Sequence, residues 1–122
     1  MTGRAKVLVI DDDPGIRKML TLALGEVGFD VVTSDGQRLD DGTDADVVLL
    51  DVRLGNRNAR QLLAQVPALT EKPIIVMTAT VDPEDAARAL PGVAAVVRKP
   101  FDLDVIETTI REVLAAAPRG RG

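Results

Sequence analysis

The chain has 122 residues, a formal net charge of −4 at pH 7, two Phe, and no Cys, His, Trp or Tyr. This length fits one domain with an aliphatic core, and the missing thiols and imidazoles exclude disulfides and the usual zinc sites. No apolar run in the sequence is long enough to span a bilayer. Residues 1–4 lead directly into an apolar run of strand length rather than into a pattern typical of a signal sequence. The acidic net charge disfavours binding of nucleic acid. We therefore expect a cytoplasmic protein that makes no membrane contact and no direct nucleic-acid contact.

Short apolar runs alternate with amphipathic patterns along the chain. The runs predict five strands, at residues 6–10, 29–33, 46–50, 74–77 and 93–97. The amphipathic stretches predict helices at residues 14–27, 58–66, 83–90 and after Asp102. Asp13 and Pro14 are typical of a helix cap and first turn, and Gly28 is typical of a helix end. The alternation predicts an α/β fold with a parallel sheet covered on both faces.

Two segments depart from this alternation. Residues 34–44, between the second and third predicted strands, contain one large apolar side chain, Leu39. Because an amphipathic helix buries an apolar stripe, we expect the second helix to be shortened or lost. After a domain over residues 1–117, the sequence of residues 118–122 predicts a flexible basic tail or the start of a linker.

Polar side chains follow four of the predicted strands. Asp11 and Asp12 follow the first strand, Asp51 the third, Thr78 the fourth and Lys99 the fifth. Each of these residues alone is typical of a turn, a helix cap or a solvated strand end. However, the carboxyl ends of parallel strands meet at one edge, where open α/β sheets bind their ligands. The joint placement therefore predicts a functional site.

The charges of these residues predict a magnesium site. Asp11, Asp12 and Asp51 would repel one another in one crevice, and Lys99 would offset only part of their charge. Mg²⁺ would cancel the remainder, since it binds carboxylates, keeps several waters and then accepts phosphate oxygens. A carboxylate can also attack phosphorus to form an acyl phosphate, with Thr78 donating to one phosphate oxygen and Lys99 pairing with another.

Four segments resemble the signature segments of the receiver domain of two-component response regulators. They are Val7–Pro14, Val47–Asp51, Val76–Ala79 and Lys99–Phe101, and the resemblance extends from Lys6 to Ala116. It implies a flavodoxin-like, doubly wound sheet of five parallel strands in the order 2-1-3-4-5. It also implies a cis peptide bond between Lys99 and Pro100.

The resemblance implies a phosphorylation-controlled signalling switch rather than an enzyme. A sensor histidine kinase, or a phosphotransfer protein of a phosphorelay, would phosphorylate Asp51. An unknown downstream protein or output domain would then respond. Asp12, Asp51 and the backbone carbonyl of Arg53 would bind Mg²⁺, and Asp11 would act partly through water.

The chain also departs from the family pattern. The segment after the second strand is shorter than usual, and Gly55 and Ala59 replace the usual Pro and Gly after the phosphoacceptor. Val96 replaces an aromatic residue, and Ala94 and Ala95 replace an acidic pair. In the resembling family, phosphorylation draws the threonine toward the phosphate and an aromatic ring rotates inward to fill the space. Val96 has no ring that could make this movement, and the two alanines lack the charges that support one common receiver dimer. We therefore expect a monomer, or an atypical dimer, that signals by a route other than this ring rotation.

Two other functions stay open at this point. A pseudo-receiver would have the same fold and act as a phosphorylation-independent protein-binding module, although the complete set of five polar site residues disfavours it. A hydrolase of the haloacid dehalogenase type would form a similar aspartyl phosphate. That chemistry needs a second acid shortly after the nucleophile, where this chain has Arg53.

Overall fold

The computed structural model describes residues 4–36, 44–54, 57–79 and 93–116. The predicted helix at 83–90 and the predicted tail at 118–122 lie outside the described residues. So do residues 37–43, which make up most of the segment where we expected the second helix to be shortened or lost. No helix in the described part of the chain is long and apolar enough to cross a bilayer.

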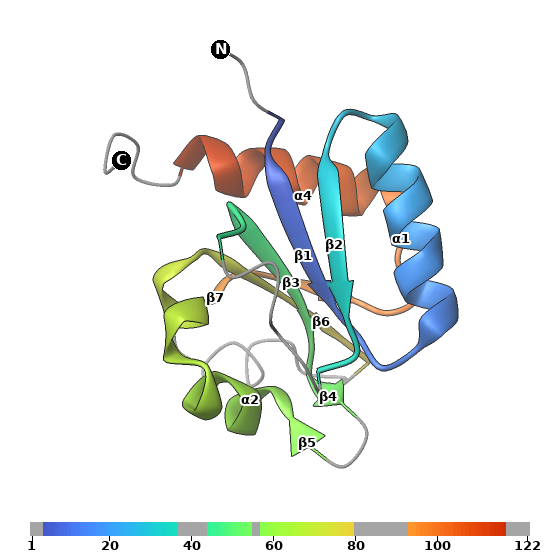
Figure 1. Ribbon diagram of the computed structural model, residues 1–122. Coiled ribbons are helices and arrows are strands. Elements are labelled where there is room, and N and C mark those ends of the chain that lie inside the picture. The colour runs from blue at the N-terminus through green and yellow to red at the C-terminus, as the bar shows by residue number, and fades with distance from the viewer. Residues whose placement is uncertain (1–3, 37–43, 55–56, 80–92, 117–122) are drawn as a thin grey trace.

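Five parallel strands form the main sheet, in the order β2-β1-β3-β6-β7 (Figure 1). Strands β6 and β7 are the fourth and fifth predicted strands, so this is the predicted order 2-1-3-4-5. The flavodoxin-like doubly wound sheet is confirmed. The bounds are β1 Lys6–Ile10, β2 Asp30–Ser34, β3 Val47–Asp51, β6 Ile74–Thr78 and β7 Val93–Arg98. A separate antiparallel pair, β4 (Arg53–Leu54) and β5 (Arg57–Asn58), follows β3 and was not predicted.

Four of the five strands end one residue later than the apolar runs predict. Asp51 pairs with Met77, and Thr78 pairs with Arg98, so both polar residues belong to the ladder. Backbone pairing uses only N–H and C=O groups, so it continues into polar residues that an apolar pattern excludes. Asp51 and Thr78 are therefore the last residues of β3 and β6 rather than the first residues of loops.

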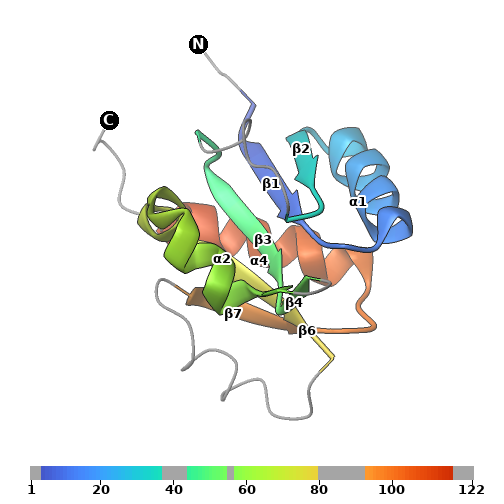
Figure 2. The same ribbon diagram turned by 60° about the horizontal axis from the view of Figure 1, so that its bottom comes forward.

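The helices cover the two faces of the sheet (Figures 1 and 2). Helices α1 (Pro14–Glu26) and α4 (Leu103–Ala116) pack on one face. Helix α2 (Ala59–Gln65) and the 3₁₀ turn η1 (Pro67–Glu71) pack on the other. Successive strand residues alternate between the two cores, as the period of two requires: Val7 and Val9 face α1 and α4, and Leu8 and Ile10 face α2.

Helix α1 begins at Pro14, as predicted, and ends at Glu26, one residue before the predicted end. The Asp13 carboxylate accepts hydrogen bonds from the amides of Gly15 at 2.8 Å and Ile16 at 3.4 Å, as an N-cap does. At the other end, Gly28 has a φ of 106°. Its amide donates to Gly25 and the Phe29 amide donates to Leu24, which is a Schellman motif. Because the cap residue Asp13 lies three residues after the end of β1, α1 starts close to the carboxyl end of that strand.

Candidate functional site

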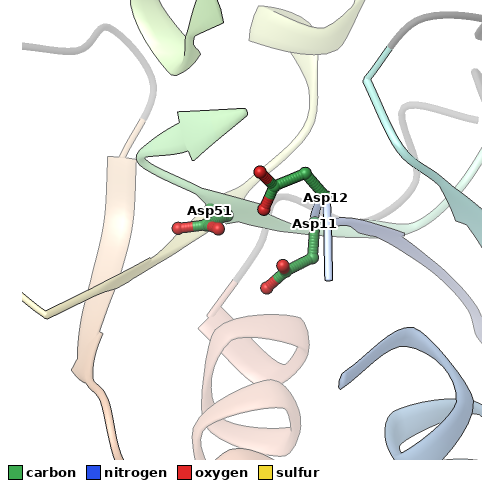
Figure 3. Close-up of side chains that lie close together, drawn as sticks. All are labelled: Asp11, Asp12 and Asp51. Carbon is green, nitrogen blue, oxygen red and sulfur yellow. The ribbon is translucent and has the colours of Figure 1, made fainter. Parts of the chain in front are cut away.

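Three carboxylates meet at the carboxyl edge of the sheet (Figure 3). Asp11 and Asp12 follow β1 and Asp51 ends β3, and each offers an oxygen within 4.8 Å of the other two. Strands β1 and β3 are hydrogen-bonded neighbours, which is why residues so far apart in sequence converge. Their exposure differs: Asp11 is fully buried, Asp51 is 8% exposed and Asp12 is exposed.

The ammonium of Lys99 lies between two of these carboxylates. Its Nζ is 2.9 Å from Asp11 Oδ2 and 3.3 Å from Asp51 Oδ2. Burial lowers the pKa of Lys99, but the hydrogen bond to Asp11 and the charges of Asp51 and Asp11 outweigh this, so its pKa lies above the ordinary value. Lys99 is therefore a stable cation at neutral pH, as the charge argument from the sequence requires.

Backbone contacts fix the position of Lys99 relative to β6. The Lys99 amide donates to the carbonyl of Thr78 at 2.8 Å, which continues the pairing of β6 with β7. The Lys99–Pro100 peptide bond is cis, as the resemblance implies. Thr78 itself is 3% exposed at the end of β6. The structure thus brings the ends of β6 and β7 together at the same edge as the three carboxylates.

The donor set of the acidic cluster fits a hard divalent cation. All three side chains offer oxygen ligands, which Mg²⁺ prefers, and two oxygens on opposite sides of Mg²⁺ lie about 4 Å apart. The observed spread of 4.8 Å is close to that separation, and the exposed side chain of Asp12 has room to adjust. The Asp11, Asp12 and Asp51 cluster therefore suits Mg²⁺. The role of the Arg53 carbonyl as a further ligand stays a prediction.

The sequence model of the response regulator receiver domain family matches residues 7–111 of this chain. The fold, the acidic cluster and this match together show that the chain belongs to the response regulator receiver domain family. Receiver domains are phosphoacceptor signalling domains of two-component systems rather than classic enzymes.

Over the aligned residues, curated relatives are about one third identical to this chain. It is 34% identical over 116 residues to the transcriptional regulatory protein GlrR of Escherichia coli K12, and covers 26% of that protein. It is 34% identical over 110 residues to the DNA-binding response regulator MtrA of Mycolicibacterium smegmatis, and covers 46% of that protein. The chain thus spans less than half the length of either relative.

Solved structures show the same fold. The chemotaxis protein CheY4 of Vibrio cholerae superimposes with a TM-score of 0.77 at 27% identity, over 91% of this chain and 99% of that one. The BeF3-activated receiver domain of RstA from Klebsiella pneumoniae superimposes with a TM-score of 0.76 at 24% identity, over 89% and 97%.

The comparisons also bear on the expected partners. Response regulators are phosphorylated by histidine kinases and act through output domains, which agrees with the partner classes that we expected. GlrR and MtrA are named as transcriptional and DNA-binding regulators. The expectation that this protein makes no direct nucleic-acid contact is therefore not supported.

Arg17 lies near the site and was not predicted from the sequence as a site residue. The guanidinium of Arg17 donates a 2.6 Å hydrogen bond to the backbone carbonyl of Asp11. A sequence signal for it exists, because Arg17 lies one helical turn after the cap residue Asp13. Helical side chains point back toward the helix N-terminus, so a long side chain at this position can reach the residues before the cap.

Proposed function

We propose that Asp51 accepts a phosphoryl group from a phosphohistidine of a sensor histidine kinase or a phosphotransfer protein. The bond between phosphorus and the histidine nitrogen breaks, and a bond between phosphorus and an Asp51 carboxylate oxygen forms. The histidine leaves with the electron pair of the broken bond and takes up a proton. The observation that carries this proposal is the Lys99 ammonium 3.3 Å from Asp51 Oδ2, beside a cluster of oxygen ligands.

The combination of some accessibility with contact to Lys99 favours Asp51 over the other two carboxylates as the phosphoacceptor. Asp11 is fully buried, and its two oxygens accept hydrogen bonds from the Asp13 amide and from Lys99. Asp12 is exposed, but the ion pairs of Lys99 are with Asp11 and Asp51. Asp51 therefore combines some exposure to an incoming phosphoryl donor with contact to a cation that can stabilise the transferred group.

The neighbours of Asp51 have distinct roles in this proposal. Asp11 and Asp12, with Asp51 and the carbonyl of Arg53, would hold Mg²⁺, which would neutralise charge on the phosphoryl oxygens during transfer. Lys99 pairs with one phosphoryl oxygen, and the hydroxyl of Thr78 donates a hydrogen bond to another. Because these groups are held by strand ends, little rearrangement is needed when the phosphoryl group arrives.

The consequence of phosphorylation in this proposal is altered binding of a downstream protein or output domain. The receiver domain would occupy residues 1–117, in the cytoplasm where kinase and output partners of two-component systems meet. Relatives such as GlrR and MtrA are longer than this chain and are named as regulators of transcription or DNA binding. Control of such an output domain is therefore the kind of response that we propose.

Labelling with a small phosphodonor tests the proposal directly. The protein is incubated with acetyl phosphate, with Mg²⁺ or with a chelator, and its intact mass is measured. We expect a gain of one phosphoryl group that requires Mg²⁺ and is lost in Asp51→Asn. Asp104→Asn is a matched control, because Asp104 is an exposed carboxylate in the first turn of α4.

The possible results of this experiment test the phosphoacceptor, the magnesium requirement and the pseudo-receiver alternative separately. Full labelling of Asp51→Asn would reject Asp51 as the phosphoacceptor. Labelling that is unaffected by the chelator would reject the magnesium requirement. No labelling of the wild-type protein, even when a histidine-phosphorylated donor protein is supplied, would favour the pseudo-receiver, a phosphorylation-independent binding module.

A further inference from the structure

Asp12 is the one exposed member of the acidic cluster, so its direction is not fixed by burial. Holding an exposed carboxylate toward a cation has an entropic cost. The backbone on either side of Asp12 reduces this cost if it is rigid, because the backbone sets the direction of the Cα–Cβ bond. The contacts of the two peptide groups that flank Asp12 therefore matter for metal binding.

Both of these peptide groups are held by hydrogen bonds. In the peptide before Asp12, the carbonyl oxygen of Asp11 accepts a 2.6 Å bond from Arg17 Nη1. In the peptide after Asp12, the amide of Asp13 donates a 2.9 Å bond to Asp11 Oδ1. Asp11 is itself anchored, because its amide donates to Ser34 at 3.1 Å and its other carboxylate oxygen accepts from Lys99 at 2.9 Å.

Of these anchors, the bond from Arg17 is the one made by a long side chain on a helix surface. Arg17 is half-buried in the first turns of α1, and its own amide donates to the carbonyl of Asp13 at 3.1 Å. Its charged guanidinium makes a stronger hydrogen bond to a carbonyl than a neutral donor would. Arg17 thus ties α1 to the peptide that leads into Asp12.

We infer that Arg17 is a positioning residue for the metal site: by holding the Asp11 carbonyl, it orients Asp12 toward the cation. This inference rests on the proposed function, because it assumes that the Asp11, Asp12 and Asp51 cluster binds Mg²⁺. Residues that orient metal ligands without binding the metal commonly change affinity by about 10- to 100-fold when they are lost. Arg17 is expected to act at the lower end of that range, since it acts through backbone.

The test compares Arg17→Met with Lys18→Met. Lys18 is the next residue of α1 and is exposed, so both variants lose one positive charge at neighbouring positions of the same helix. Mg²⁺ affinity of the unphosphorylated protein is measured by isothermal titration calorimetry with MgCl₂. We expect Arg17→Met to bind Mg²⁺ roughly tenfold more weakly and Lys18→Met to change the affinity less than about twofold.

A conservative variant separates positioning from folding. Arg17→Lys keeps a donor on a side chain of similar length, so we expect it to recover part of the lost affinity. Circular dichroism checks that each variant is folded. Amide hydrogen exchange without Mg²⁺ gives a second readout: exchange at Asp12 and Asp13 should be faster in Arg17→Met than in Lys18→Met.

The outcomes distinguish this inference from the proposal on which it rests. Equal Mg²⁺ affinities of Arg17→Met and Lys18→Met, with unchanged exchange at Asp12 and Asp13, would overturn the role of Arg17. Equal losses of affinity in both variants would also overturn it. Removal of a positive charge by itself should strengthen Mg²⁺ binding, so equal losses would show a general disturbance of α1 instead. If the wild-type protein itself binds no Mg²⁺, the magnesium part of the proposed function fails instead, and the exchange experiment still tests the effect of Arg17 on the backbone.

Discussion

Lys99 and Asp11 form an ion pair between side chains 88 residues apart in sequence, with Nζ 2.9 Å from Oδ2. The Asp11 side chain is fully buried and that of Lys99 is 19% exposed. A buried carboxylate without a partner is strongly unfavourable, so this pair couples the end of β1 to the end of β7. The same ammonium also contacts Asp51, and the pair therefore links the packing of the fold to the chemistry of the site.

Loss of this cation should destabilise the protein. Lys99→Met would leave Asp11 buried with one hydrogen-bond partner fewer, and we expect a loss of about 3 kcal/mol in the free energy of unfolding. Urea denaturation without Mg²⁺ measures it. Lys18→Met, which removes an exposed cation from α1, is the control and should change stability little. A change of similar size in both variants would contradict a specific role of the ion pair.

Asp11→Asn and Asp12→Asn should change stability in opposite directions, although each removes one negative charge. Asp12 is an exposed member of a like-charged cluster, so its neutralisation should stabilise the Mg²⁺-free protein by up to about 1 kcal/mol. In Asp11→Asn the amide can still accept from the Asp13 N–H, but its NH₂ group would then face the Lys99 ammonium. We expect a destabilisation of about 3 kcal/mol.

Thermal denaturation with and without MgCl₂ checks this pair of variants. Stabilisation of the wild-type protein by Mg²⁺ should be much reduced in Asp12→Asn, since a ligand is lost. If the two variants shifted stability in the same direction, the distinction between a structural Asp11 and a ligand Asp12 would be wrong.

Two glycines at the end of α1 should respond in opposite ways to alanine. Gly25 is inside the helix, and a Cβ built there meets nothing within 4 Å. Gly25→Ala should therefore stabilise the protein by about 0.5–1 kcal/mol through helix propensity and reduced chain entropy.

Gly28 also has open space around it, but its φ of 106° is unfavourable for any side chain. Gly28→Ala should destabilise by about 1 kcal/mol. Urea denaturation of both variants tests the contrast, and stabilisation by Gly28→Ala would show that the helix end relaxes.

Beryllofluoride, which mimics the phosphoryl group, should have little effect on β7 and α4. Val96 is half-buried against the core on the α2 side and has no ring that could change position. We expect amide exchange to slow at Asp11–Asp13 and around Asp51, with no dimerisation by analytical ultracentrifugation. Strong protection from exchange along β7 and α4, together with a dimer, would contradict this prediction. It would show that this receiver reshapes β7 and α4 on activation although Val96 lacks the aromatic ring of the family.

Local patterns were sufficient for much of the fold. Apolar runs located the strands, Asp13 and Gly28 located the ends of α1, and the parallel direction of the strands placed the polar strand ends at one edge. These features depend on residues close in sequence or on general rules of α/β sheets. The strand ends at Asp51 and Thr78 were missed by one residue, because pairing of the backbone continues after the apolar side chains stop.

The sequence by itself determined which residues would meet at the site, since strand order and chain direction bring Asp11, Asp51 and Lys99 to one edge. Only the tertiary structure decided how they divide their roles. Lys99 lies closer to Asp11 than to Asp51, and Arg17 holds the Asp11 carbonyl. Those contacts depend on side-chain conformation and on the spacing of elements that are distant in sequence, which hydrophobic periodicity does not encode.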